Sequence, residues 1–132
     1  MGKLNKAQII FEKITDSCYR LPSGTKLDEV LLINKEAVIQ DVELPLEKAG
    51  AFLDFFHKEI GIRPVWVCPT KVANPEHSFD LYPMTPHKLY LNFGFWDVVA
   101  TTQPPGYYNR AIESKLKELE GKKSLYSDVY YS

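Results

Sequence analysis

The sequence predicts an α+β domain of the ferredoxin-like type, in which two helices cover one face of a four-stranded antiparallel sheet and a further helix precedes the sheet. Two observations predict this class. Segments that alternate apolar and polar residues are interspersed with segments that carry an apolar stripe, in the order helix, strand, helix, strand, strand, helix, strand. Three predicted strands also have an aliphatic side and an aromatic-polar side, which is typical of a sheet covered on one face.

The first 35 residues are predicted to form a helix and a connector. A helix over Asn5–Leu21 is indicated by a capping residue, Asn5, and by apolar residues at helical spacing, which are Ile10, Ile14, Cys18 and Leu21. The turn signal Pro22-Ser23-Gly24 ends this segment. The remaining residues, 36–132, are predicted to form one domain that contains the whole sheet.

The first half of that domain reads as strand, helix, strand. Glu36–Pro45 alternates apolar and polar residues and is predicted to be the first strand, which Pro45 ends. Leu46–Ile60 carries an apolar stripe that ends at Gly61, so we expect a helix there. Arg63–Pro69 is predicted to be the second strand.

The second half begins with a long connection. Thr70–His87 contains three prolines and no clear periodicity, and loops of this length in a compact domain are usually functional or disordered. We expect an ordered flap, because Phe79, Leu81, Tyr82 and Met84 can pack. Lys88–Trp96 is predicted to be the third strand. Asn109–Glu120 is an amphipathic helix closed by Gly121, and Ser124–Tyr131 is the predicted fourth strand.

The last three strands separate their side chains into two sets, because successive side chains in a strand point to opposite faces. The aliphatic set, which we expect beneath the helices, is Val65, Val67, Leu89, Leu91, Phe93, Leu125 and Val129. The other set is aromatic and polar, and consists of Trp66, Cys68, Tyr90, Asn92, Trp96, Tyr126, Asp128 and Tyr130. A face with so many large rings is expected to meet another sheet, a second domain or a ligand rather than water alone.

Composition narrows the function further. The 132 residues are 45% hydrophobic and 25% charged, which fits one globular domain. A net charge of −1 gives no support to nucleic-acid binding. Cys18 and Cys68 lack a CxxC spacing, so we expect free thiols and a cytoplasmic protein. The chain shows neither a signal peptide nor an apolar run that approaches the roughly 20 residues of a membrane span.

Several short motifs resemble a known family. They are PVWVCP, LYPM, LYLNFGFWD, PPGYYNR and LYSDVYYS, and from about Val38 to the C-terminus they resemble the C-terminal part of FAD-dependent sterol side-chain (delta24-sterol) reductases, flavoproteins of the vanillyl-alcohol-oxidase type. The resemblance implies a cap, or substrate-binding, domain laid over the flavin. It also implies that FAD is held mainly by another domain of the same full-length protein, that NADPH supplies electrons, and that the isolated chain is inactive.

The aromatic-polar set then supplies the candidate site. Tyr126 and Asp128 are the predicted catalytic residues. The residues predicted to face an apolar substrate or the flavin are Trp66, Tyr90, Asn92, Trp96 and Tyr130. Most have a structural alternative. Tyr126 and Tyr130 would be rim residues, and Asp128 would be solvated or paired with a lysine such as Lys88. The tryptophans would pack on each other or on the flap, and Asn92 would lie in a bulge.

Other chemistries have weaker support. The seven glycines are scattered, and no GxGxxG or phosphate loop is present to hold a nucleotide. His77, His87 and Cys68 do not match a zinc-ligand spacing, so no metal site is predicted. The rival to the cap-domain hypothesis is a free-standing ferredoxin-like binding module that forms a homodimer through its aromatic sheet face.

Overall fold

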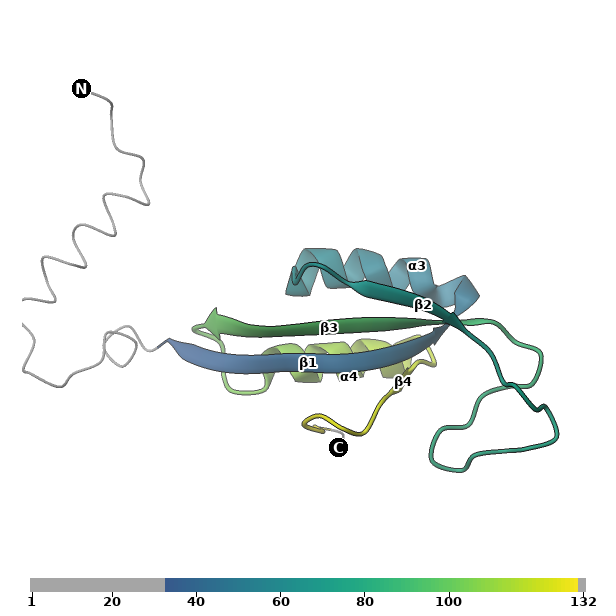
Figure 1. The fold of residues 1–132 in the computed structure, drawn as a ribbon. Helices are drawn as coiled ribbons and strands as arrows, with labels where there is room; N and C mark the ends of the chain where they lie inside the picture. The colour runs from purple at the N-terminus through teal and green to yellow at the C-terminus, as the bar shows by residue number, and fades with distance from the viewer. Residues whose placement is uncertain (1–32, 131–132) are drawn as a thin grey trace, which may run out of the picture. The chain divides into compact units, whose positions relative to one another are not determined.

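The computed structural model describes residues 33–130, so the predicted helix over Asn5–Leu21 lies outside the described residues. The described part is an α+β domain with a four-stranded antiparallel sheet and two helices, which confirms the α+β part of the prediction (Figure 1). Its elements in chain order are β1 (Asn34–Pro45), α3 (Leu46–Phe55), the π-helical turn η1 (Phe56–Ile60), β2 (Trp66–Thr70), β3 (Tyr90–Thr101), α4 (Tyr107–Glu118) and β4 (Lys122–Lys123). No helix in this part of the chain is long and apolar enough to cross a membrane.

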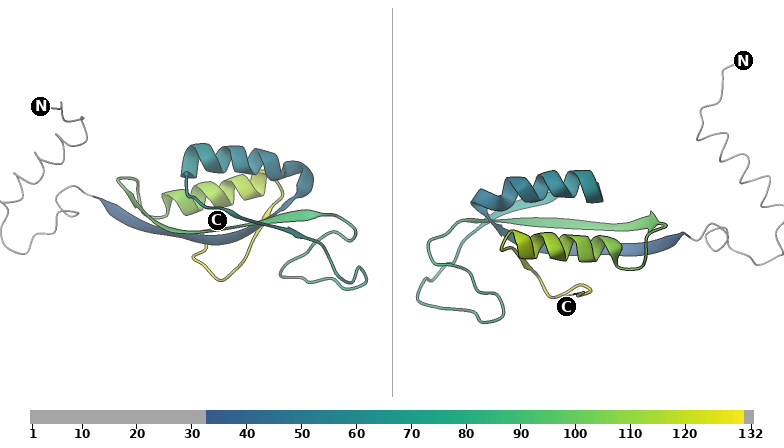
Figure 2. Two further views of the ribbon diagram at one scale, coloured as in Figure 1. Left: turned by 45° about the horizontal axis from the view of Figure 1, so that its top comes forward. Right: turned by 180° about the vertical axis from the view of Figure 1, so that it is seen from behind.

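The strands lie in the order β2-β3-β1-β4. β2 runs antiparallel to β3 with Trp66 opposite Gly94, and β4 runs antiparallel to β1 with Val42 opposite Lys123. Both α3 and α4 lie on one face of the sheet, which the view from behind shows most clearly (Figure 2). We call the other face, which carries no helix, the open face.

The helix that follows β1 forms as its apolar spacing predicts. Phe52 and Phe56 lie one turn apart and are fully buried, together with Ala49 on the same side. The last turn widens into η1, and the Gly61 amide donates to the Phe56 carbonyl oxygen at 2.8 Å. Gly61 has φ 77°, a left-handed conformation that glycine adopts without strain, so the predicted end of the helix is confirmed.

A core of apolar side chains fills the space between the helices and the sheet. Phe52 stacks on Phe93 with ring centroids 5.6 Å apart, and Phe56 lies 4.4 Å from Phe95. The other fully buried or nearly buried core members are Val38, Val42, Leu44, Ala49, Ile60, Ile62, Ile112 and Leu116. The core therefore consists of the helix-facing side chains of β1 and β3 and the inner faces of α3 and α4.

The predicted aliphatic set is only partly buried. Phe93 lies in the core and Val65 and Leu91 pack against it, as expected. The prediction is wrong for the exposed members, which are Val67, Leu89, Leu125 and Val129. Val67 faces the same side as its partner Phe93 but lies on the edge strand, where helix cover ends.

The predicted fourth strand, Ser124–Tyr131, is wrong. β4 contains only Lys122 and Lys123, and one further bond, from the Ser124 amide to the Asp41 carbonyl oxygen at 2.9 Å, continues the pairing. Residues 125–130 then leave the sheet. Two contacts hold these residues. The ammonium group of Lys123, on β4, donates to the Asp128 carbonyl oxygen, and the Tyr130 amide donates to the carboxylate of Glu113, on α4, at 3.0 Å.

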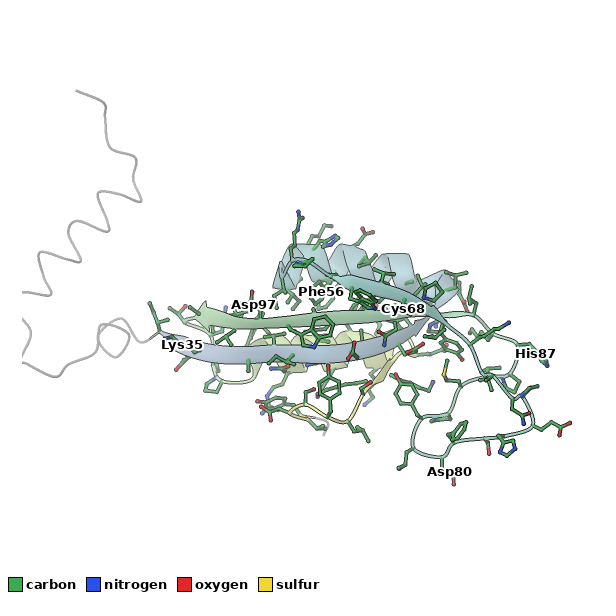
Figure 3. All side chains as sticks on the ribbon, viewed as in Figure 1. Lys35, Phe56, Cys68, Asp80, His87 and Asp97 are labelled. Atoms are coloured by element: carbon green, nitrogen blue, oxygen red, sulfur yellow. The ribbon has the colours of Figure 1, made fainter. Side chains whose placement is uncertain are left out.

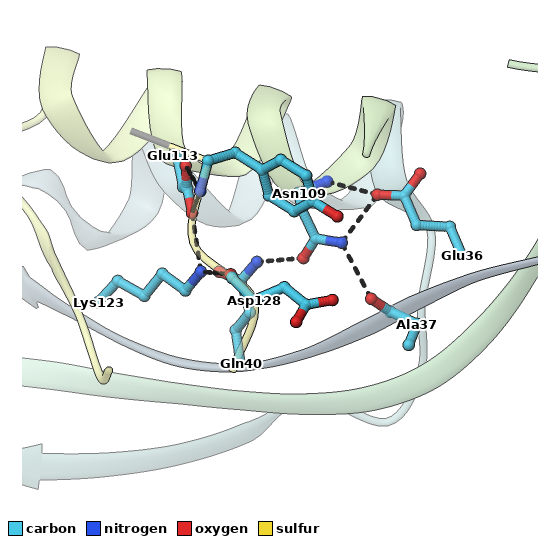
Figure 4. Close-up of polar contacts among 8 residues, drawn as sticks. Glu36, Ala37, Gln40, Asn109, Glu113, Lys123 and Asp128 are labelled. Carbon is cyan, nitrogen blue, oxygen red and sulfur yellow. Dashed lines mark hydrogen bonds and ion pairs between the residues drawn. The ribbon is translucent and has the colours of Figure 1, made fainter. Parts of the chain in front are cut away.

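These contacts belong to a polar network buried beneath α4 (Figure 4). Lys123 and Glu113 form an ion pair of 2.7 Å whose lysine side chain has no exposed surface. At the start of α4, the Glu36 carboxylate accepts from the Asn109 amide at 2.9 Å, which satisfies a free backbone donor and places negative charge at the positive end of the helix. Gln40 donates to the Asn109 side chain. The network fixes α4 and the C-terminal segment to β1.

Candidate functional site

Strand alternation places one set of side chains together on the open face. β2 contributes Trp66 and Cys68, which lie opposite Gly94 and Asn92 of β3. On the three longer strands this set includes Asp41, Glu43, Trp66, Cys68, Tyr90, Asn92, Gly94 and Trp96. The predicted parity of Trp66, Asn92 and Trp96 agrees with this arrangement.

One end of the open face is aromatic. The side chains of Trp66 and Trp96 are 61% and 54% exposed. The Trp96 ring lies over Gly94, because a Cβ atom added at Gly94 would come within 2.5 Å of the ring and 2.6 Å of an Asp41 carboxylate oxygen. Any larger residue at position 94 would therefore displace the ring or the carboxylate.

Tyr126 reaches this aromatic end from the C-terminal segment. Its hydroxyl donates to the Asp41 carboxylate at 2.8 Å, and more than half of the side chain is exposed. Burial of the hydroxyl and its bond to Asp41 raise the pKa of Tyr126 above its ordinary value of 10.0. Asp41 thus holds the phenol over the open face in its neutral form.

The other end of the open face is polar. Glu43 is only 5% exposed, and its carboxylate accepts from the Asn92 side-chain amide at 3.3 Å. Burial raises the pKa of Glu43 above 4.5, although Asn92 and the Tyr82 hydroxyl act in the opposite direction. Tyr82 comes from the connection between β2 and β3, residues 71–89, to which we apply the name flap from here on. The pKa of Tyr82 is raised, first by burial and then by the Glu43 charge. A carboxyl group with a raised pKa can hold a proton closer to neutral pH than an ordinary glutamate.

The flap covers part of this end. Tyr90 has the parity of the open face, yet it is 3% exposed, and its hydroxyl accepts from the Thr85 amide of the flap at 3.0 Å. The ammonium groups of Lys88 and Lys122 lie 5.9 and 5.8 Å from the centre of its ring. Tyr90 therefore anchors the flap to the sheet.

Two predicted site residues lie elsewhere. The Tyr130 ring packs against α4, 4.6 Å from the Arg110 guanidinium carbon and in close contact with Gly106. The prediction that Tyr130 shares a strand face with Tyr126 is wrong, because β4 ends before either residue. Asp128 is exposed, and its backbone carbonyl rather than its carboxylate contacts Lys123.

Sequence reasoning missed three residues of the site: Asp41, Glu43 and Tyr82. The first two alternate with the buried Val42 and Leu44 along β1, and this alternation was a readable signal for two carboxylates on one face. Tyr82 lies in the flap, where no periodicity indicates which side chain folds back. Among the described residues, no group of three or more histidine, cysteine, aspartate or glutamate side chains could hold a metal ion.

Comparison with known proteins gives two matches. The chain is 33% identical over 103 residues to a Delta(24)-sterol reductase homolog of Caenorhabditis elegans, a match that covers 75% of this chain and 19% of the relative. It is 39% identical over 46 residues to Delta(24)-sterol reductase of Arabidopsis thaliana, which covers 35% of this chain and 8% of the relative. No family model and no solved structure matches the chain. The chain spans about a fifth of the length of the first relative, and it is homologous to that part of the Delta(24)-sterol reductases.

Proposed function

We propose that this chain forms the cap, or substrate-binding, domain of an FAD-linked oxidoreductase that reduces a carbon–carbon double bond. The partial homology to Delta(24)-sterol reductases supports the reaction class. The observation that carries the proposal is the contrast between the faces of the sheet, because two helices cover one side while Trp66 and Trp96 stand more than half exposed on the other. Exposed tryptophans on one face are typical of a surface that contacts a ligand or another domain.

The ferredoxin-like topology is part of this proposal. The strand order β2-β3-β1-β4 supports it, since each half of the domain then contributes one central strand, one edge strand and one helix. In this arrangement both helices occupy the same face, and the opposite face is free to contact the flavin or an apolar substrate.

The chemistry would divide between the two parts of the full-length protein. Reduced FAD, held mainly by a domain other than this one, would transfer hydride to one alkene carbon, and a protein group would supply a proton to the other. Trp66, Trp96 and Asn92 would form the wall that faces the flavin or the apolar substrate. Tyr126 is the better placed of the two predicted catalytic residues, because Asp41 holds its hydroxyl over this wall. Asp128 stays a prediction.

A chimera tests the proposal. The matching segment of the Caenorhabditis elegans relative is replaced by this chain, and the reoxidation of its reduced flavin by a Delta(24)-sterol is followed by absorbance without oxygen. We expect reoxidation, and a rate about tenfold lower in the Trp66→Ala/Trp96→Ala variant, because each ring supplies contact area to the guest. Tyr107→Ala is the matched control, since Tyr107 is an exposed ring on α4. Equal losses in both variants would contradict a specific role for the open face.

The same exposed rings also support the rival, a binding module that dimerises through its open face. Sedimentation of the isolated chain separates the two hypotheses. A monomer that binds an added flavin domain supports the cap. A tight dimer that dissociates in the Trp66→Ala/Trp96→Ala variant supports the module.

A further inference from the structure

The flap lines a half-open cavity that adjoins the open face at Tyr82. It has a volume of about 450 Å³, which lies within the range of small-molecule sites. Figure 3 shows the flap extending beyond the end of the sheet, with Asp80 and His87 on it. The cavity is lined by Lys71, Val72, Ala73, Asn74, His77, Ser78, Phe79, Tyr82, Pro83 and Met84. Its wall is therefore built by one stretch of chain.

Hydrogen bonds hold this stretch in shape. The His77 amide donates to the Asn74 carbonyl oxygen at 3.2 Å, and the Tyr82 amide donates to the Phe79 carbonyl oxygen at 3.1 Å. The bond from the Thr85 amide to the Tyr90 hydroxyl ties the flap to the sheet. The cavity is thus formed before any ligand enters, which reduces the entropy lost on binding.

The charge of the lining is one-sided. Lys71 provides an ammonium group and His77 an imidazole, and no carboxylate lines the cavity. The two carboxylates of the flap, Glu76 and Asp80, are exposed and lie outside the cavity wall. The rest of the lining is mainly apolar, so the cavity suits an apolar body with a group that accepts hydrogen bonds or carries negative charge.

The buried Glu43 affects where the negative group of such a ligand would lie in the cavity. Its carboxyl group interacts with Tyr82, and its second oxygen, Oε1, has no hydrogen-bond partner in the described part of the chain. A negative group beside Tyr82 would be repelled by the Glu43 charge, because Glu43 interacts with that tyrosine. The Lys71 ammonium, which also lines the cavity, would attract it.

We propose that the flap cavity binds a small amphiphilic anion, an apolar chain or ring that ends in a carboxylate, with the carboxylate toward Lys71 and His77 and the apolar part among Phe79, Pro83 and Met84. The site goes beyond the proposed function, because it lies on the flap and needs neither flavin nor a second domain. Its test uses this chain alone, so its failure is distinguishable from failure of the cap-domain proposal.

The experiment titrates the full chain with decanoate, below its micelle concentration, and follows backbone amide shifts by NMR. We expect saturable shifts concentrated in residues 71–84, and binding by decylammonium at least about tenfold weaker, because the lining is cationic. Lys71→Gln is expected to weaken decanoate about threefold and to leave decanol unchanged, since an exposed ion pair contributes little. Ala73→Phe places a large side chain in the cavity from an exposed position. This variant should abolish the binding of decanoate and of decanol without unfolding the chain.

Three results would overturn the site. Equal affinity for decylammonium and decanoate would remove the charge argument. Shifts at the indole groups of Trp66 and Trp96 instead of the flap would place the ligand on the open face. Binding to phosphatidylglycerol vesicles without saturable binding of free decanoate would indicate a lipid surface rather than a small molecule.

Discussion

The two faces of the sheet differ in what covers their aromatic rings. On the helix-covered face, Phe52, Phe56, Phe93 and Phe95 are fully buried and contact one another. On the open face, Trp66 and Trp96 present most of their surface to solvent. Strand alternation separates Phe93 and Phe95 from Trp66 and Trp96, and Phe52 and Phe56, from the helical segment that follows β1, cover the first pair. The same strands therefore build the core with one set of residues and leave the next set exposed.

The charged groups of the two faces differ as well. Beneath α4, the buried charges are paired: Lys123 with Glu113, and Glu36 with backbone amides at the start of the helix. On the open face, Glu43 has a raised pKa and an oxygen without a partner in the described part of the chain. Paired charges fix a structure, whereas an incompletely satisfied carboxyl group in a half-covered position is typical of a functional site.

The sharpest way to break this comparison is to remove a ring from the helix-covered face. Phe56→Ala should lower the free energy of unfolding by about 4 kcal/mol, because the ring is fully buried against Phe52 and Phe95 and leaves a cavity. Trp96→Ala on the open face should change it by less than about 1 kcal/mol. Urea unfolding measures both. Similar losses in the two variants would contradict the assignment of the faces.

Breaking the ion pair under α4 is the next largest effect. Lys123→Met should destabilise the chain by about 3 kcal/mol, because it leaves the Glu113 carboxylate buried without its partner. The Glu113→Leu/Lys123→Met double variant should recover much of that loss, since no buried charge remains. The comparison uses urea unfolding at one pH. A single variant as stable as the parent would show that the pair is open to water.

The smallest expected effect concerns Glu43 and pH. Because its pKa in the folded chain lies above the ordinary 4.5, ionisation of Glu43 disfavours the folded state. The stability associated with its neutral form is fully present below 4.5 and is lost as pH rises through the folded-state pKa. Glu43→Gln cannot ionise, so the stability of the variant relative to the parent should increase with pH.

Urea unfolding of both proteins from about pH 4 to about pH 8 measures that difference. Glu47 and Glu120, whose pKa values are lowered by contacts with Lys88 and Lys48, respond in the opposite sense. They are present in both proteins and cancel in the comparison. A difference that stays constant with pH would show that the Glu43 pKa is unaltered by folding.

The elements predicted best are those whose apolar spacing matches what they bury. Leu46–Ile60 is helical over its full predicted length, and the parity of Trp66, Asn92 and Trp96 follows from alternation alone. The predicted fourth strand is wrong because apolar and polar residues continue to alternate from Leu125 to Tyr130 although the chain has left the sheet there. The cause is the buried Lys123, whose partners Glu113 and Asp128 come from positions that local pattern cannot relate to it.

The candidate site was predictable where it follows strand parity and not where it depends on folding back of the flap. Tyr82 and Tyr90 are brought together with Glu43 and Thr85 by the path of a segment without periodicity. The sequence predicts Tyr126 as a site residue but not its partner Asp41, which is 85 positions earlier in the chain. A polar contact between residues far apart in the chain cannot be predicted from the local pattern of a single sequence.

Tryptophan fluorescence tests the central claim most directly, because the chain has two tryptophans and both lie on the open face. We predict that the folded, isolated chain shows a solvent-exposed emission spectrum that acrylamide quenches strongly, and that an added flavin-containing domain of the Caenorhabditis elegans relative reduces this quenching. Emission typical of buried indoles, inaccessible to acrylamide in the isolated monomer, would contradict the account.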